Sequence, residues 1–265
     1  MNNGQATVPS TGKNVKELLE YMFSKELAPT AVKPSISLTA AQNKEYEVGT
    51  QVTPTYNISF NPGSYTYGPD TGITATYSVT DTAGSEALTT ASGVFDMLTV
   101  GDDTNYSITA VASYTDGAIP VSNLGKEVAD KQIKASTLTK TSGALTGYRA
   151  FFYGATATDA ITSATIRSKL TNGGKPVRKT LPTYSASTVE GAKKVIVAIP
   201  VTSGLSVQKV LMPSAQNADI TSEFVKQAEV VAVKGLNDYE AADYYVWVYQ
   251  PASLDSTEQY DITIG

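Results

Sequence analysis

Two long stretches of the chain alternate hydrophobic and polar positions with a period of two, which is the pattern of half-buried β-strands. In the first stretch, residues 34–135, Ile36 and Leu38 alternate with polar neighbours, and a longer run alternates from Tyr106 to Tyr114. Turn sequences rich in Gly, Pro, Asn and Asp separate these runs. This arrangement predicts an immunoglobulin-like β-sandwich over residues 34–135. The polar residues 136–146 are expected to form a linker behind it.

The second stretch, residues 147–265, predicts another β-sandwich with one short helix. Its strands are expected near residues 148–153, 194–201, 207–211, 225–233, 244–249 and 260–264. The run Val195–Ile199 is apolar at every position, so we expect a central strand that is covered on both faces. A helix is expected over Asp159–Leu170, with Thr158 or Asp159 as its N-cap and Asn172–Gly174 after its end.

Residues 1–33 are expected to form a flexible arm and an anchoring helix. Asn14 suits an N-cap, Glu17 completes a capping-box pattern, and Pro29 ends the helix. The apolar residues of one helical face are Val15, Leu18, Leu19 and Met22. A helix this short is marginal alone in water, so this face needs a cover. The cover is either the first β-domain, or copies of the same helix, or a partner protein; in the last two cases these four residues are assembly contacts.

Composition narrows the classes of function. Only 17% of the 265 residues are charged, below the ~25% of ordinary soluble domains, and the formal net charge is −5. No basic run is present, so we expect no nucleic-acid partner. No segment approaches the roughly 20 apolar residues of a membrane span. The polar N-terminus lacks the apolar centre of a signal peptide, so we expect synthesis in a cytoplasm without classical secretion.

The chain contains neither histidine nor cysteine. This removes Ser-His-Asp and Cys-His catalysis, the commonest general base, and cysteine-based metal sites. We therefore expect no enzymatic activity, no catalytic residue, and no cofactor or metal ion. Two alternatives stay open. Asp102-Asp103 can act as calcium ligands instead of turn formers, and two of the scattered carboxylates between Glu223 and Asp243 can act as a glycosidase pair.

Aromatic residues are the candidates for surface contact. Tyr65 and Tyr67 fall in the turn-rich stretch NPGSYTYGPD, where rings either contact partners or fold back on their own sandwich. Tyr245, Trp247 and Tyr249 share one face of an expected strand. They either fill the core, with Trp247 at its centre, or form an aromatic platform for a sugar or a partner subunit. The other face of that strand is apolar too, and both faces can be buried only if a helix or a neighbour covers the outer one.

The order of these segments resembles a family of virion proteins of tailed bacteriophages, notably gut phages. VKELLEYMFSKELAPTAVKPSISL resembles the helix-then-proline entry to a β-domain in fibre-type proteins, and EVGTQVTPTYNISFNPGSYTYGP resembles the strand pair that follows. VSNLGKEVADKQIKAST and LTGYRAFFYG resemble the junction into their C-terminal domain, and ATIRSKL, VIVAIP, NADITSEF and YYVWVYQPA its later motifs. The resemblance covers most of residues 15–265. It implies a place in the virion and an adhesive or architectural role, and it supplies no site residues.

These observations lead to one hypothesis with two rivals. The arm and helix attach to capsid or tail proteins, and two β-sandwiches project from the virion surface as part of a symmetric homo-oligomer, a trimer by analogy with fibres. The weakly charged surface, rich in Thr and Tyr, suits multivalent contact with host glycans or mucus. The first rival is a carbohydrate-binding adhesin module, and the second, less favoured, is a glycan depolymerase.

Overall fold

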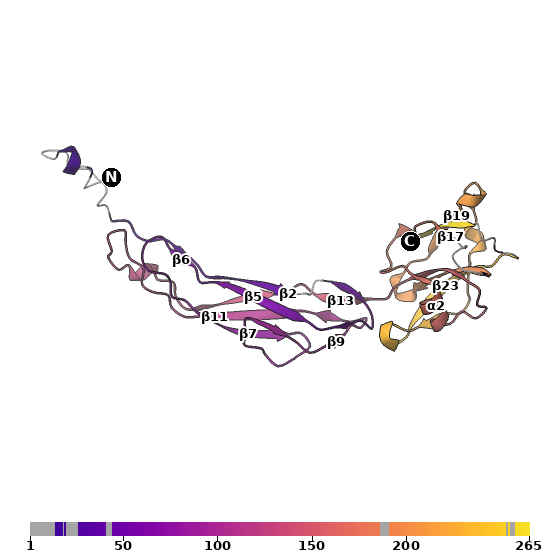
Figure 1. Cartoon of the computed structure of the whole chain (residues 1–265), viewed down its shortest axis with the longest axis horizontal. Helices are drawn as coiled ribbons and strands as arrows, with labels where there is room; N and C mark the ends of the chain where they lie inside the picture. The colour runs from indigo at the N-terminus through magenta and orange to yellow at the C-terminus, as the bar shows by residue number, and fades with distance from the viewer. Residues whose placement is uncertain are drawn as a thin grey trace, which may run out of the picture. The chain divides into compact units, whose positions relative to one another are not determined.

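The computed structural model describes residues 14–17, 19, 26–40, 44–185, 191–252, 254 and 258–265 (Figure 1). The chain divides into two compact units. Unit 1 comprises the described residues of Met1–Ala40, Thr55–Val94 and Ile108–Ser142, and unit 2 those of Ala41–Pro54, Phe95–Ser107 and Gly143–Gly265.

This division differs from the boundaries expected from the sequence. Residues 41–54 and 95–107 were expected within the first sandwich, but they cluster with the C-terminal part of the chain. Residues 136–146, expected as a linker, hold one complete strand of unit 1 and the first residues of a strand in unit 2. Hydrogen bonds and ion pairs between the early segments and the C-terminal part explain their place in unit 2.

Unit 1 consists of antiparallel sheets, and Figure 1 shows β2 and β5 running side by side. Its elements are β1 (Ala31–Val32), β2 (Ser35–Ala40), β5 (Thr55–Asn61), β6 (Ser64–Tyr65), β7 (Ala75–Asp81), β8 (Ser92–Val94), β11 (Ile108–Tyr114), η1 (Ala129–Lys131) and β12 (Ser136–Thr141). One sheet has the order β2-β5-β8 and another the order β12-β11-β7, while β1 pairs with β6. Along β11, Ile108, Ala110 and Ala112 are buried and alternate with more exposed neighbours, as the period of two predicts.

Unit 2 contains two larger sheets. Its elements are β3 (Glu45–Glu47), β4 (Gln51–Val52), β9 (Leu98–Thr99), β10 (Asn105–Tyr106), β13 (Leu145–Tyr148), β14 (Phe152–Thr156), α2 (Ser163–Lys169), β15 (Thr171–Asn172), β16 (Lys179–Thr180), β17 (Tyr184–Ser185), β18 (Lys194–Pro200), η3 (Val201–Ser203), β19 (Val207–Met212), η4 (Pro213–Ala215), β20 (Ala218–Asp219), η5 (Thr221–Glu223), β21 (Val225–Lys226), β22 (Val231–Val233), η6 (Leu236–Asp238), β23 (Ala242–Tyr249) and β24 (Gln259–Ile264). A six-stranded sheet has the order β15-β14-β18-β23-β21, with β22 also paired to β23. A five-stranded sheet has the order β16-β24-β19-β20, with β17 also paired to β24.

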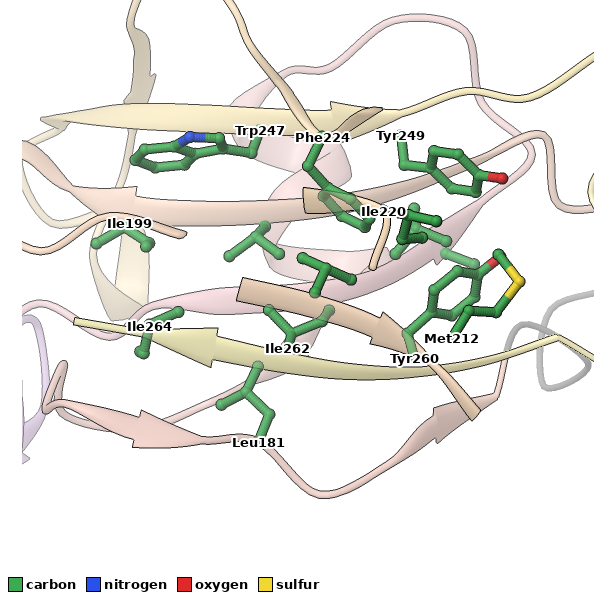
Figure 2. Close-up of a cluster of buried hydrophobic side chains, with 14 of the residues drawn as sticks. Leu181, Ile199, Met212, Ile220, Phe224, Trp247, Tyr249, Tyr260, Ile262 and Ile264 are labelled. Carbon is green, nitrogen blue, oxygen red and sulfur yellow. The ribbon is translucent and has the colours of Figure 1, made fainter. Parts of the chain in front are cut away.

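The main core of unit 2 lies between these two sheets, as Figure 2 shows. Trp247 and Tyr249 enter it from β23 of the six-stranded sheet, and Tyr260 and Ile262 enter it from β24 of the five-stranded sheet. Burying each large apolar side chain contributes about 1.5–3 kcal/mol, so this interface holds the two sheets together. The prediction of a mainly-β chain built from β-sandwiches is confirmed.

The six-stranded sheet is covered on its outer face as well. Tyr244, Val246 and Val248 of β23 pack in a second buried cluster with Ile166 of α2. Every residue of β18 is buried, so the prediction of a central strand covered on both faces is confirmed. The helix supplies the outer cover that the two apolar faces of β23 require.

The boundaries of α2 differ from those predicted. The helix begins at Ser163, and the hydroxyl of its N-cap, Thr162, accepts a hydrogen bond from the backbone N–H of Thr165 at 3.2 Å. Thr158 and Asp159 therefore do not cap it. The helix ends before Leu170, which is already extended, and Asn172 belongs to the short strand β15.

Candidate functional site

The predicted capping box at the N-terminus is present. The backbone N–H of Glu17 donates to Asn14 Oδ1 at 3.0 Å, and the N–H of Asn14 donates to Glu17 Oε2 at 2.8 Å. Residues 15–17 and 19 are helical. On this helix Val15 is 73% exposed and Leu19 is 46% exposed. Unit 1 therefore does not bury either side chain, while the other two expected assembly contacts, Leu18 and Met22, lie outside the described residues.

Leu27 is hydrogen-bonded to a later segment of unit 1. The backbone N–H of Leu27 donates to Asn123 Oδ1 at 2.7 Å, and the backbone N–H of Asn123 donates to the carbonyl oxygen of Leu27 at 3.2 Å. Pro29 is buried, whereas Leu27 is 46% exposed. Within the described residues 26–30, the segment is thus joined to the rest of unit 1 by hydrogen bonds at Leu27 and at Thr30, whose carbonyl oxygen accepts from the backbone N–H of Thr66 at 2.9 Å.

The two tyrosines of the NPGSYTYGPD loop are both half-buried in unit 1. Tyr65 folds back on its own unit, because its hydroxyl accepts a hydrogen bond from the backbone N–H of Ile133 at 2.9 Å. Tyr65 also lines a small hollow of about 290 Å³ formed by residues 62–65 and 68–73. Asp70 is the charged side chain in this lining. Tyr67 is not part of the lining, so the loop does not bring the two rings to one recess.

The aromatic residues of β23 belong mainly to the core. Trp247 and Tyr249 are each only 7% exposed and pack between the sheets, where Tyr249 stacks on Phe224 with ring centroids 5.5 Å apart (Figure 2). This burial excludes both residues from an aromatic surface platform. Tyr245 is half-buried, and the ammonium of Lys226 lies 3.3 Å from the centroid of its ring. Of the three, Tyr245 alone keeps substantial contact with solvent.

A groove that the sequence analysis did not predict lies on the outer face of the six-stranded sheet. The expected strand 225–233 is interrupted: β21 pairs with Val248 and Trp247, β22 pairs with residues 242–244, and residues 227–230 between them leave the sheet. The backbone N–H of Gln227 still donates to Val246 O at 2.8 Å. This departure leaves a groove of about 670 Å³ over Val246 and Val248. The polar stretch Gln227-Ala228-Glu229 inside an apolar run was the signal for it.

Lys194 is the buried charge of this groove. It is the first residue of β18, is 5% exposed, and lines the groove together with Asp159 and Ile161. Its ammonium donates to the backbone carbonyl of Asp159 at 3.0 Å. The Asp159 carboxylate is exposed and lies 3.6 Å from the ammonium of the neighbouring Lys193 instead. Lys194 therefore makes no ion pair with any carboxylate in the described part of the chain.

Asp102, considered above as a calcium ligand, is engaged in an ion pair. Both of its carboxylate oxygens accept hydrogen bonds from Arg149, which is 6% exposed and which also donates to Glu240 O at 2.6 Å. The hydrogen bond to Asp102 raises the pKa of Arg149. Within the described residues, no three acidic side chains converge where they could hold a metal ion. Asp102 and Asp103 lie in a turn, as their alternative interpretation required.

Comparison of the chain with protein-family models, with curated proteins and with solved structures finds no match. Among the described residues, no helix has the length and apolar character needed to span a membrane.

Proposed function

We propose that this chain is a non-enzymatic structural protein of a bacteriophage particle, a fibre or a decoration protein of the capsid or tail. The observation that carries the proposal is the capped N-terminal helix, on which Val15 and Leu19 remain exposed. Apolar side chains such as these two, which the described part of the chain leaves exposed, are suited to contact with a partner protein or with other copies of the same helix. The sequence resembles phage virion proteins, and this resemblance suggests that the partners are other proteins of the virion.

In this proposal the two β-units project from the virion surface, and the N-terminal helix attaches them to capsid or tail proteins. The architecture supports such a role because the sandwich units of the chain are held by buried apolar cores instead of disulfides. A closed homo-oligomer, with a trimer as the specific expectation, would present several copies of each surface. Several weak contacts with host glycans or mucus then add up to firm adhesion.

The test is the composition of the particle. Phage particles produced by a host that carries the gene are purified on a density gradient, and their proteins are quantified by mass spectrometry against the major capsid protein. We expect peptides of this chain at a fixed ratio to the capsid protein, and antibody-gold labelling of intact particles by an antiserum to the recombinant chain. Absence of the chain from purified particles would overturn the proposal.

A second measurement addresses the oligomer. Light scattering after gel filtration of the full recombinant chain gives its native mass directly. A mass of three times 27.9 kDa supports the trimer. A mass of one chain at all concentrations would contradict self-association and leave particle proteins as the cover of the helix.

A further inference from the structure

The groove on the outer face of the six-stranded sheet combines features that do not suit a merely solvated surface. Lys194 is almost completely buried, yet within the described residues its ammonium, which has three N–H donors, meets only one acceptor, the neutral Asp159 O. A buried cation is costly unless an anion or several acceptors compensate it. The groove beside it is large enough for a small ligand, because sites of roughly 300–1,000 Å³ hold such molecules.

The remaining lining indicates which kind of anion fits. The apolar floor consists of Val248, on the same face of the sheet as Lys194, and of the more exposed Val230 and Val231 beside it. Gln227, Gln250 and Glu229 supply amide and carboxylate groups along the lining. Apolar floor, polar rim and one buried cation match a sugar ring that carries a carboxylate: the C–H face of the ring contacts the valines, its hydroxyls meet the rim, and its carboxylate meets the ammonium.

An extended peptide fits the same groove poorly. Peptides that bind to sheets do so by adding a strand to a free edge. Here both edges of β23 are occupied, one by β18 and the other by β21 and β22, and Gln227 N–H takes the carbonyl of Val246 between them. The backbone of β23 at the floor of the groove therefore has no unpaired edge to which a peptide strand could add.

We propose that this groove is a binding site for an acidic sugar residue, a hexuronic or sialic acid, whose carboxylate pairs with Lys194. The proposal does not depend on a place in a phage particle, and it stands or falls on binding by the purified chain. It also gives the second unit a specific ligand class, which the aromatic residues of β23 do not supply.

The test compares two probes that differ at one carbon. Methyl β-glucuronide and methyl β-glucoside share their ring and hydroxyls, and only the first carries a carboxylate. Binding of each to the full chain is measured by saturation-transfer NMR and titration calorimetry, with N-acetylneuraminic acid as a second acid. We expect the glucuronide to bind roughly tenfold or more tightly than the glucoside, because a charge-assisted hydrogen bond is lost in the latter.

Matched variants locate the site. Lys194→Met removes the buried ammonium but keeps an unbranched side chain, and it should abolish the preference for the glucuronide. Lys209→Met, at an exposed lysine of β19 in the other sheet and outside the groove lining, should leave that preference unchanged. Ala228→Trp, at an exposed position in the lining, should block both sugars without touching Lys194, and it keeps the proposal testable if Lys194→Met fails to fold.

Three outcomes would overturn the proposal. The first is the absence of acid-sugar binding by the wild-type chain at millimolar concentration. The second is equal loss of binding in the Lys209→Met and Lys194→Met variants. The third is tighter binding of an N-acetylated dipeptide with a free C-terminal carboxylate, which would assign the groove to peptide ends instead of sugars.

Discussion

The carboxylate of Glu47 accepts a hydrogen bond from the guanidinium of Arg167 at 2.6 Å, although 120 positions separate the two residues in the chain. The second oxygen of Glu47 accepts from Asn172 Nδ2 at 2.7 Å, and the Arg167 guanidinium lies 5.3 Å from the centroid of the Phe152 ring. The two charged side chains are only 9% and 19% exposed. This pair joins the segment around β3 to α2 and, together with the parallel pairing of β3 with β13, explains why residues 41–54 cluster with unit 2.

Removing the charge of one partner of this ion pair should destabilise unit 2. Glu47→Gln leaves the Arg167 guanidinium poorly compensated in a largely buried place, and we expect a loss of about 3 kcal/mol in the free energy of unfolding. Trp247 is the only tryptophan of the chain and is buried in unit 2, so urea unfolding followed by its fluorescence reports on this unit.

The control is an exposed ion pair in the same unit. Lys234 and Asp238 lie 3.0 Å apart, four residues from each other, with mostly exposed side chains. Lys234→Gln should cost no more than about 0.5 kcal/mol. Equal effects of Glu47→Gln and Lys234→Gln would show that the buried pair contributes nothing beyond a surface contact.

Arg149 should be irreplaceable by lysine. Its guanidinium donates to both oxygens of Asp102 and to Glu240 O, and it lies 5.5 Å from the ring centroid of Tyr239. A lysine keeps the charge but cannot make the paired hydrogen bonds of the planar guanidinium. We expect Arg149→Lys to cost about 1–3 kcal/mol in urea unfolding. Arg178→Lys, a change of an exposed arginine, should leave the midpoint unchanged, and an equal shift in both variants would contradict this account.

Buried tyrosines predict a loss of stability in alkali. Tyr244 is 1% exposed and its hydroxyl donates to Ala150 O at 2.7 Å; burial raises its pKa well above the ordinary value. Burial also raises the pKa of Tyr260, with the hydrogen bond to Glu258 as the second cause. Below about pH 10 both tyrosines are neutral in the folded and the unfolded chain, so they cause no pH dependence there. Above it the unfolded chain releases their protons more readily, and stability should fall as pH rises.

Tyr244→Phe separates the two effects of this hydroxyl. At neutral pH the variant should lose about 1–3 kcal/mol, because Ala150 O is left without its donor. Above about pH 10 its stability should fall less steeply than that of the wild type, because one ionising group is gone. Thermal unfolding followed by Trp247 fluorescence from pH 7 to 11 measures both, and Tyr67→Phe in unit 1 serves as the control. If stability falls equally steeply with pH in the wild type and in Tyr244→Phe, ionisation of Tyr244 does not contribute to the loss of stability in alkali.

The local sequence pattern predicted correctly those elements whose determining residues lie close together in the chain. The capping box of Asn14 and Glu17 forms as predicted, because both partners fall within one helical turn. The apolar run of β18 is buried on both faces, as a continuous run without polar positions requires. For Trp247 the pattern left a core position and a surface platform open, and the structure places its side chain in the core.

The sequence pattern did not predict features that depend on contacts between residues far apart in the chain. The pairing of Glu47 with Arg167 has no signal in either local sequence, so residues 41–54 were expected in the first sandwich. The expected strand 148–153 is divided between β13 and β14, with Arg149 turned toward Asp102 in the gap. The groove arises where the 227–230 segment leaves the sheet, which depends on how β21 and β22 meet β23.

The exposed helix predicts a selective effect on assembly. Leu19→Asp places a charge on the apolar face at a position that is 46% exposed, so the two β-units should keep their thermal transitions while self-association or particle attachment is lost. Native mass by light scattering and incorporation into particles are the measurements. Leu124→Asp, at a 55% exposed leucine of unit 1, should change neither. Cooperative unfolding of unit 1 in Leu19→Asp would instead make the helix part of its core.

Gly49 and Gly84 have similar backbone angles, but only at Gly49 would an added methyl group collide with another segment. Comparing their alanine variants therefore separates the cost of backbone strain from the cost of a steric clash. Gly49 has φ +87° and Gly84 has φ +81°, a region that side chains other than glycine rarely adopt. A methyl group on Gly49 would stand 1.9 Å from the carbonyl oxygen of Leu236, whereas one on Gly84 would have no neighbouring atom of the described residues within 4 Å. The close approach is fixed by backbone hydrogen bonds, since Leu236 N–H donates to Val48 O at 2.9 Å and Asn237 Nδ2 donates to Gly49 O at 3.0 Å.

Gly84→Ala should therefore cost only the strain of the backbone, about 1–2 kcal/mol. Gly49→Ala carries the same strain and must also push the 235–239 turn away from the segment around Val48, so its loss should be clearly larger and should appear in the Trp247 transition of unit 2. Gly84 belongs to unit 1, so its variant should leave that transition in place and lower only the transition of unit 1, measured by circular dichroism. Equal losses in the two variants would mean that the turn at Leu236 moves freely to make room for the added methyl group.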